Sequence, residues 1–520
     1  MPTEQDHYRL WLVALFSGLT FVLMRGVTDP DIWTHLTIGR EVVRLRDIPA
    51  TEFYVAPLAG QPGHFNEWGY GVVLYLIELM GGMTALALFN AAIAAATFTL
   101  LFDILRRRLH GNLWLALSTV LLGVWIADFR LNFRPEMLMY LAVVASLWGM
   151  ERYRQTPQIR WLLPLLGAGL ILPQFHPSIL LCLIAVGAHS IEYLRQSRTR
   201  RYFFEVLVAA LITFVLASFN PYGFEQVILP IKFALDAPLI SGITELLPAL
   251  QTEVAPQFIV SAAAASFGFI LTRQRSRVGD VLLIAVFGWL AYQHARNVAL
   301  FGLLALFPLA SGLARMEGKF AGKWGVAVAI IALAVVGSHT VKASKWGVGL
   351  DLSGTPVKAG GILSELDLKG PVLGFFHLGN YLAWTLYPKT QVIADARHFG
   401  FNESIRLHDH LFSALDGWER EVRQARISAV VTPMTMPYSG EFVPLALALL
   451  RSPDWSLVVS EEAGLTFLPV ETYRGPVLPA NAAWDRALTE LNLNLGEYPD
   501  SAATKKNLEF ARIARFKVGL

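Results

Sequence analysis

The sequence has few charged residues and almost no cysteine. Charged residues make up 16% of its 520 positions, whereas soluble globular domains average about 25%. Hydrophobic residues make up 54%, and the mean hydropathy is +0.47. The single cysteine, Cys182, excludes an intrachain disulfide. This composition excludes an ordinary soluble domain and predicts a mainly α-helical, polytopic membrane protein surrounded by membrane lipids.

A cleavable signal peptide and a nucleic-acid-binding signature are also missing. The first apolar run, residues 8–27, is long and has no small-residue cleavage site. We therefore expect it to be the first membrane span. The net charge is only +3, and we expect no nucleic-acid partner.

Long apolar runs are what the sequence has in abundance. A membrane-spanning helix needs about 20 apolar residues. Eleven candidate spans follow from this requirement: 8–27, 83–105, 113–129, 136–151, 161–175, 178–194, 202–219, 255–272, 279–294, 297–314 and 324–342.

Basic residues fall in every second loop between these runs. Five loops hold sixteen Arg and Lys: 106–111, 151–160, 195–201, 273–277 and 315–323. The positive-inside rule makes these loops and the N-terminus cytoplasmic. The domain plan is therefore a transmembrane domain, residues 1–342, whose first outer loop is 28–82. An extracytoplasmic domain, residues 343–520, follows.

One further apolar segment, residues 67–82, is expected not to cross the membrane. It is short and is broken by Gly81 and Gly82. If it crossed, every later loop would change sides, against the basic pattern. We predict a helix that lies at the membrane surface or dips into it, where the aromatic residues Trp68, Tyr70 and Tyr75 suit the interface.

The first outer loop places two carboxylates, Asp29 and Asp31, at the end of an apolar run. Such carboxylates can hold Mg²⁺ or Mn²⁺, accept a proton from an attacking hydroxyl, or cap a helix. Asp31 could simply be the N-cap of an amphipathic helix from Ile32 to Arg44. His35 lies four residues after Asp31 and would share its helix face.

Other outward-facing loops combine cations with a carboxylate: Arg130, Arg134, Glu136, His176, His294 and Arg296. An arginine fork matches the oxygens of a phosphate. The alternative for a lone Arg at a span end is that it only reaches the lipid headgroups. Several such residues on one face favour a binding site. We predict that Arg134, His176 and Arg296 surround one outward cavity that takes a lipid phosphate.

Residues 343–520 have a different composition and predict a small α/β domain. Four stretches indicate short strands joined by helices: 370–384, 390–400, 427–434 and 455–470. Residues 481–516 predict a helical pair. Asp395, Arg397 and His398 follow one expected strand, and they form either a substrate contact or a structural Asp–Arg turn.

The first outer loop resembles that of a large group of bacterial membrane proteins similar to GT-C glycosyltransferases. This class includes protein mannosyltransferases and oligosaccharyltransferases. The matching residues are Asp29, Asp31, Trp33, His35, Leu36, Gly39, Ile48, Pro49, Glu67 and Trp68. Later pieces, "FRPE", "NPYG", "ARN" and "GNYLAWTLYP…VIADAR", also resemble the group.

The resemblance implies sugar transfer at the outer face of the bacterial cytoplasmic membrane. The donor would be a sugar on a polyprenyl phosphate, and the acceptor a lipid-linked glycan or a protein. An aspartate of the first loop, Asp29 or Asp31, would be the base or a metal ligand. The residues that we expect to contact substrate are His35, Glu67, Arg134, Glu136, His176, Arg296 and Arg397.

Three other functions are compatible with a polytopic protein. A transporter or flippase is one, but the sequence shows no inverted repeat and no paired interrupted helices. An O-antigen ligase or polymerase is another, although such proteins lack an acidic pair in the first loop. The third is a non-enzymatic envelope assembly protein that works through residues 343–520.

Overall fold

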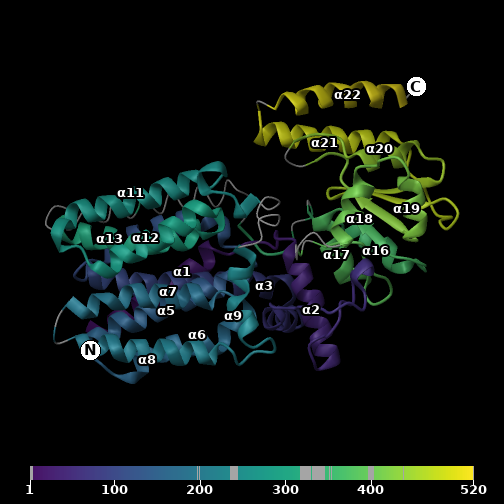
Figure 1. Ribbon diagram of the computed structural model, residues 1–520. Coiled ribbons are helices and arrows are strands. Elements are labelled where there is room, and N and C mark those ends of the chain that lie inside the picture. The colour runs from purple at the N-terminus through teal and green to yellow at the C-terminus, as the bar shows by residue number, and fades with distance from the viewer. Residues whose placement is uncertain are drawn as a thin grey trace. The chain divides into compact units, whose positions relative to one another are not determined.

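The computed structural model divides the chain into two compact units (Figure 1). It describes residues 4–195, 197, 199–234, 244–316, 330, 346–350, 352, 354–395, 397, 403–436, 439–499 and 501–518. The first unit contains residues 1–27 and 66–349, and the second contains 28–65 and 350–520. We expected residues 28–65 to belong to the transmembrane domain. They fold instead with the C-terminal domain, for the reason given below.

The first unit is a helical bundle. Its α-helices are α1 (Glu4–Val22), α3 (Trp68–Arg108), α4 (Leu113–Ala127), α5 (Glu136–Gln155), α6 (Leu163–Phe175), α7 (Ile179–Ser190), α8 (Arg200–Leu216), α9 (Phe224–Ala234), α11 (Ala255–Thr272), α12 (Val278–Gln293) and α13 (Val298–Leu313). This agrees with the expected mainly α fold.

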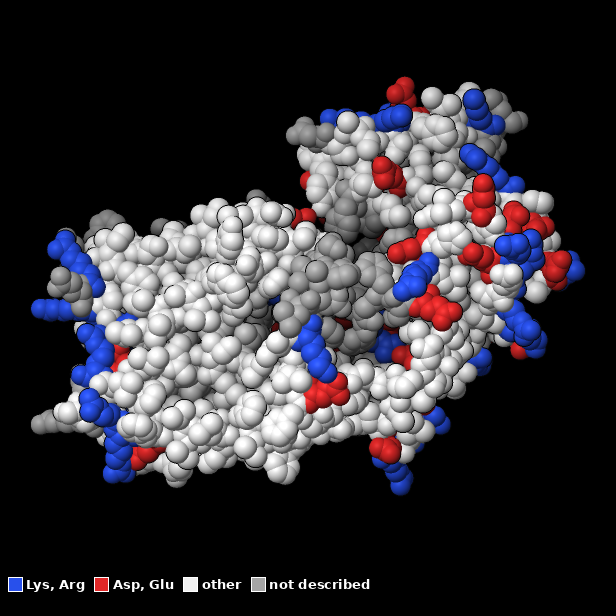
Figure 2. Space-filling view, in the orientation of Figure 1, with Lys and Arg blue, Asp and Glu red and all other residues white. Residues whose placement is uncertain are grey.

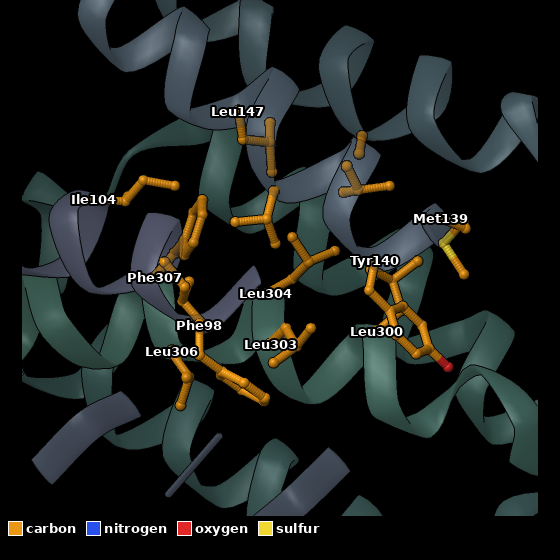
Figure 3. Close-up of a cluster of buried hydrophobic side chains, with 14 of the residues drawn as sticks. Phe98, Ile104, Met139, Tyr140, Leu147, Leu300, Leu303, Leu304, Leu306 and Phe307 are labelled. Atoms are coloured by element: carbon orange, nitrogen blue, oxygen red, sulfur yellow. The ribbon is translucent and has the colours of Figure 1, made fainter. Parts of the chain in front are cut away.

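Helices α3, α5 and α13 share the core of the bundle. Figure 3 shows Phe98 and Leu147 from the first two helices beside Leu304 and Phe307 of α13. Helix α11 packs directly on α13, because a Cβ atom at Gly268 would lie 2.3 Å from the backbone of Pro308. A small residue at this contact lets the two backbones approach, as in packed membrane helices.

Among the described residues, four helices are long and apolar enough to cross a membrane: Trp68–Arg108, Leu113–Arg130, Ala255–Thr272 and Ala295–Met316. Shorter apolar helices cover His7–Val22, Ile159–Phe175 and Val278–Gln293. The expected span 324–342 lies outside the described residues, apart from residue 330. The total of eleven spans stays a prediction.

The basic loops meet at one end of this bundle. Arg107 donates to the Gln155 side chain (3.0 Å), Arg195 donates to the Ser276 carbonyl (3.0 Å) and Arg277 donates to Glu151 (2.7 Å). Figure 2 shows Lys and Arg gathered at the left end of the unit, beside an almost uncharged flank. The basic loops that alternate along the sequence thus lie together at one end of the bundle, which we call the basic end.

Helix α3 is broken where the sequence predicts it, at Gly81 and Gly82, and Gly82 has φ +60°. Glu67 lies 3.6 Å from His176, and the Asn90 side chain donates to the Leu131 carbonyl (3.1 Å). Both contacts are at the end opposite the basic end. The segment 67–82 therefore starts at that end and is separated from the rest of α3 by the two glycines. That it does not cross the membrane stays a prediction.

The second unit contains a four-stranded mixed sheet in the order β1-β2-β4-β3. Its strands are β1 (Val372–Gly374), β2 (Ala429–Thr432), β3 (Trp455–Glu461) and β4 (Gly464–Pro469). β1 and β2 pair in parallel, while β4 is antiparallel to both of its neighbours. The expected strand at 390–400 is present only as bridges through Val392, and residues 396 and 398–400, including His398, lie outside the described part.

In the described part of the chain, the α-helices of this unit are α2 (Asp31–Leu45), α16 (Val357–Glu365), α17 (Phe376–Leu386), α18 (Glu403–Phe412), α19 (Trp418–Gln424), α20 (Pro444–Arg451), α21 (Asn481–Glu497) and α22 (Ala502–Val518). The pair α21–α22 is the expected C-terminal helical pair (Figure 1). The prediction of a small α/β domain agrees with this unit.

The first loop joins the second unit through the edge of the sheet. The Ala56 amide donates to the Val392 carbonyl (2.8 Å), and the Val392 amide donates to the Tyr54 carbonyl (2.9 Å). Val392 in turn bridges to Val372 of β1. Backbone pairing of this kind satisfies buried N–H and C=O groups, which explains why residues 28–65 fold with the C-terminal domain.

Candidate functional site

The acidic pair lies at the start of α2 in the second unit. The helix begins at Asp31, and Pro30 in the N-cap position offers no side-chain cap. The Asp29 carboxylate accepts a hydrogen bond from the Asp31 amide (3.1 Å), and Asp29 is buried. The sequence favoured Asp31 over Asp29 for the capping alternative, whereas in the structure the local capping contact is made by Asp29. Asp31 and His35 lie one turn apart on α2, as expected.

Helix α17 holds this turn in place. The Asn380 side chain donates to the Pro30 carbonyl (3.1 Å), and the Trp33 ring packs edge-on against Tyr381 with centroids 4.8 Å apart. The Arg40 guanidinium lies 4.4 Å over the Trp384 ring. The "GNYLAWTLYP" stretch that resembles the GT-C group is thus the support for the acidic turn. The composition of residues 379–388 did not predict that they contact the acidic turn.

Arg397 forms a buried network within the second unit. Its guanidinium donates to Asp395 (2.5 Å) and to Glu52 (2.9 Å), and it lies 4.4 Å over the Tyr54 ring. The neighbouring carboxylates raise the pKa of Arg397 against the effect of burial. This geometry matches the alternative prediction of a structural Asp–Arg turn. Through Glu52, the network also includes the first loop. A substrate contact through Arg397 stays a prediction.

The first unit gathers the other candidates at the end opposite the basic end. Arg130 and Arg134 both contact the Glu245 carboxylate, at 2.5 and 3.2 Å, and Arg296 contacts Glu136 at 3.2 Å. These elements are far apart in the sequence, so the ion pairs tie the start of α5 to two later loops. We call these five residues the arginine cluster.

His176 adjoins the arginine cluster and Glu67. Its Nε2 atom lies 3.6 Å from the Glu67 carboxylate, and its Nδ1 atom is buried without a hydrogen-bond partner in the described part of the chain. Burial lowers the pKa of His176 to about 4, although nearby Glu136 acts in the opposite direction. His176 is therefore neutral near pH 7, so the positive charge of this region comes from the arginines.

Glu245 was missed by the sequence reasoning. It lies in the long stretch between residues 224 and 254, with several other acids and no motif, and only the fold brings it to Arg130 and Arg134. Burial acts to raise its pKa, but the two guanidiniums outweigh this and hold the pKa of the Glu245 carboxyl below its usual range. Glu245 is thus an ionised carboxylate held in the fork of two arginines.

A complete protein metal site is not found among the residues that the structure describes, because no group of three His, Cys, Asp or Glu could hold an ion. Asp29 and Asp31 could offer Mg²⁺ or Mn²⁺ two carboxylates, with water and substrate oxygens completing the shell. A metal at this pair stays a prediction.

Comparisons with known proteins identify the fold. No family model and no curated protein sequence matches the chain. Among solved structures, the archaeal oligosaccharyltransferase AglB from Archaeoglobus fulgidus, in complex with an inhibitory peptide and a dolichol-phosphate, aligns with a TM-score of 0.60 and 10% identity, covering 90% of this chain and 75% of that one. ArnT from Cupriavidus metallidurans in the apo state aligns with a TM-score of 0.56 and 13% identity, covering 91% of this chain and 100% of that one.

Both neighbours are GT-C glycosyltransferases. The chain shares the fold of these two proteins. A third match is ArnT bound to undecaprenyl phosphate, with a TM-score of 0.54 and 14% identity over 90% of this chain and 99% of that one. The fold confirms the resemblance stated from the first loop. Because the alignments cover about nine-tenths of the chain, the GT-C likeness extends well beyond that loop.

Proposed function

We propose that this GT-C protein is a glycosyltransferase of the bacterial cytoplasmic membrane. It transfers a sugar from a polyprenyl phosphate to a lipid-linked glycan or a protein on the outer face. The observation that supports this most is the arginine cluster, three guanidiniums at one end of an apolar helical bundle. Neighbours with the same fold include complexes with dolichol-phosphate and undecaprenyl phosphate.

The arginine cluster is the proposed site for the donor phosphate. Guanidinium forks match phosphate oxygens, and charge-assisted bonds are roughly twice as strong as neutral ones. Neutral His176 can add a hydrogen bond but no charge. The apolar flank of the bundle suits the isoprenoid chain, which gains about 0.8 kcal/mol per buried CH₂ group.

Asp31 is the proposed general base. The acceptor hydroxyl oxygen bonds to the anomeric carbon, while the bond from that carbon to the phosphate oxygen breaks. The leaving polyprenyl phosphate keeps the electron pair, and the acceptor proton passes to the Asp31 carboxylate. A single displacement of this kind inverts the anomeric centre.

The test is transfer by the full-length protein in proteoliposomes. A radiolabelled polyprenyl-phosphate sugar is supplied with extracted lipid-linked glycans or membrane proteins as acceptors. The proposal predicts labelled product together with free polyprenyl phosphate in equal amounts. Donor that remains intact with every acceptor, while the protein stays folded, contradicts it.

Neutralising Glu245 is expected to tighten binding of undecaprenyl phosphate about tenfold, which is 1.4 kcal/mol. The reason is that the lipid phosphate must compete with this carboxylate for Arg130 and Arg134. The variant is Glu245→Gln, and affinity is measured in nanodiscs by native mass spectrometry.

The matched control for this prediction is Glu225→Gln. Glu225 pairs with Lys232 at 2.7 Å, and both side chains are more than half exposed, so its loss leaves lipid affinity unchanged. Arg134→Gln weakens binding. Equal or weaker binding by Glu245→Gln would show that the phosphate does not use these two arginines.

A further inference from the structure

The second unit contains a cavity of about 790 Å³, within the range of small-molecule sites. It lies where the parallel strands β1 and β2 begin. Its walls come from the first loop, from the segment before β1, from the segment after α17 and from the turn after α19. All of these belong to one unit, and the turn after α19 contacts Gly370 so closely that a Cβ there would lie 1.8 Å from the Arg426 carbonyl oxygen.

The charged lining of the cavity is mostly basic. Lys369, Lys389 and Arg426 line it, against one acid, Glu403. Lys369 pairs with exposed Asp367, and the Lys389 ammonium donates to a backbone carbonyl, that of Ser364 (2.7 Å). Exposed pairs contribute little, so these cations can exchange their present partners for an anionic ligand at low cost.

Flat apolar surfaces lie beside these cations. The rings of Phe53 and Tyr387 meet edge-on with centroids 5.1 Å apart, and Pro57, Pro371 and Pro388 also line the cavity. The face of an aromatic ring carries partial negative charge and attracts partially positive C–H groups. Sugar rings present such C–H faces. A ligand with sugar rings and negative groups therefore matches both parts of the lining.

Tyr387 connects the cavity to the acidic turn. Its hydroxyl donates to Glu41 on α2 (3.2 Å), and Arg40 donates to its carbonyl (3.0 Å). Glu41 is ten residues after Asp31 on the same helix. At 1.5 Å per residue this separation is about 15 Å, which a chain of a few sugars spans.

We propose that this cavity binds an anionic glycan, the acceptor whose far end reaches Asp31. The inference rests on the proposed function and narrows its acceptor from a glycan or protein to a glycan that carries carboxylate or phosphate groups. Lys389 and Arg426 hold the negative groups, and Phe53 and Tyr387 hold the sugar rings. None of these residues is part of the proposed transfer chemistry.

The test measures binding to the full-length protein in nanodiscs by isothermal titration calorimetry. The probes are trigalacturonic acid, its neutral counterpart maltotriose, and an acidic peptide of equal charge. We expect the anionic trisaccharide to bind best and the double variant Lys389→Glu, Arg426→Glu to weaken it at least about tenfold, or 1.4 kcal/mol. The control is Arg451→Glu, an exposed position on α20 outside the cavity.

The outcomes separate the inference from the proposed function. Weaker binding by the double variant, with Asp31→Asn binding normally, supports the cavity even if no sugar is ever transferred. Equal binding of both trisaccharides, preference for the peptide, or an unchanged double variant overturns it. A lipid-anchored trisaccharide that competes better than the free one identifies a membrane-borne source, and equal competition identifies a free glycan.

Discussion

Replacing Asp31 with asparagine is expected to slow sugar transfer about 10²–10⁴-fold, the usual cost of losing a general base. The protein should remain folded, because Pro30 rather than Asp31 is at the N-cap and the local capping bond is accepted by Asp29. The measurement is single-turnover transfer in proteoliposomes with saturating donor.

Asp29 provides the contrast. Asparagine keeps an oxygen that can accept the hydrogen bond from the Asp31 amide. Asp29→Asn should therefore retain near-normal stability and near-normal sugar transfer. Asp29→Ala loses the contact, at about 1 kcal/mol of stability. Asp47→Asn, an exposed acid in the same loop, controls for net charge. If Asp29→Asn and Asp31→Asn both transfer normally, the acidic pair is structural and the mechanism is wrong.

Replacing Arg108 with glutamine is expected to lower the free energy of unfolding by about 3–5 kcal/mol. Arg108 is only 2% exposed and bonds to Asp280 (2.6 Å) and Glu151 (2.9 Å). These residues lie on α3, α12 and α5, so the contacts join three helices at the basic end. Without Arg108, the buried Asp280 carboxylate loses the guanidinium that bonds to it, and Glu151 loses one of its two arginine partners but keeps Arg277.

The matched control for Arg108 is Arg201→Gln. The Arg201 side chain is 83% exposed and pairs with Glu205 one helical turn away, a contact worth about 0–1 kcal/mol. Stability is measured by denaturant-induced unfolding in detergent micelles. Equal stability of the two variants would mean that the buried network does not hold the helices together.

The helical bundle could be predicted because its signals are local. Apolar runs, basic loops and the Gly81–Gly82 break each follow from a few neighbouring residues. The structure agrees with the basic end and with the interruption of α3. The number of spans depends on thresholds of length and hydropathy, and several helices are shorter than about 20 residues.

Long-range partners could not be predicted in the same way. The first loop follows an apolar run, so it was assigned to the transmembrane domain, but backbone bonds between residues 54–56 and Val392 place it in the second unit. Pairing of distant strands leaves no periodic signal in either segment. The same holds for Glu245, whose role depends on two arginines more than a hundred positions earlier.

The most direct test of the central claim is a cryo-electron microscopy structure of the full-length protein with undecaprenyl phosphate in nanodiscs. The account predicts phosphate density within hydrogen-bonding distance of Arg130, Arg134 and Arg296, with the Glu245 carboxylate displaced from its two arginines. Phosphate bound elsewhere, with the contacts of Glu245 unchanged, would contradict it.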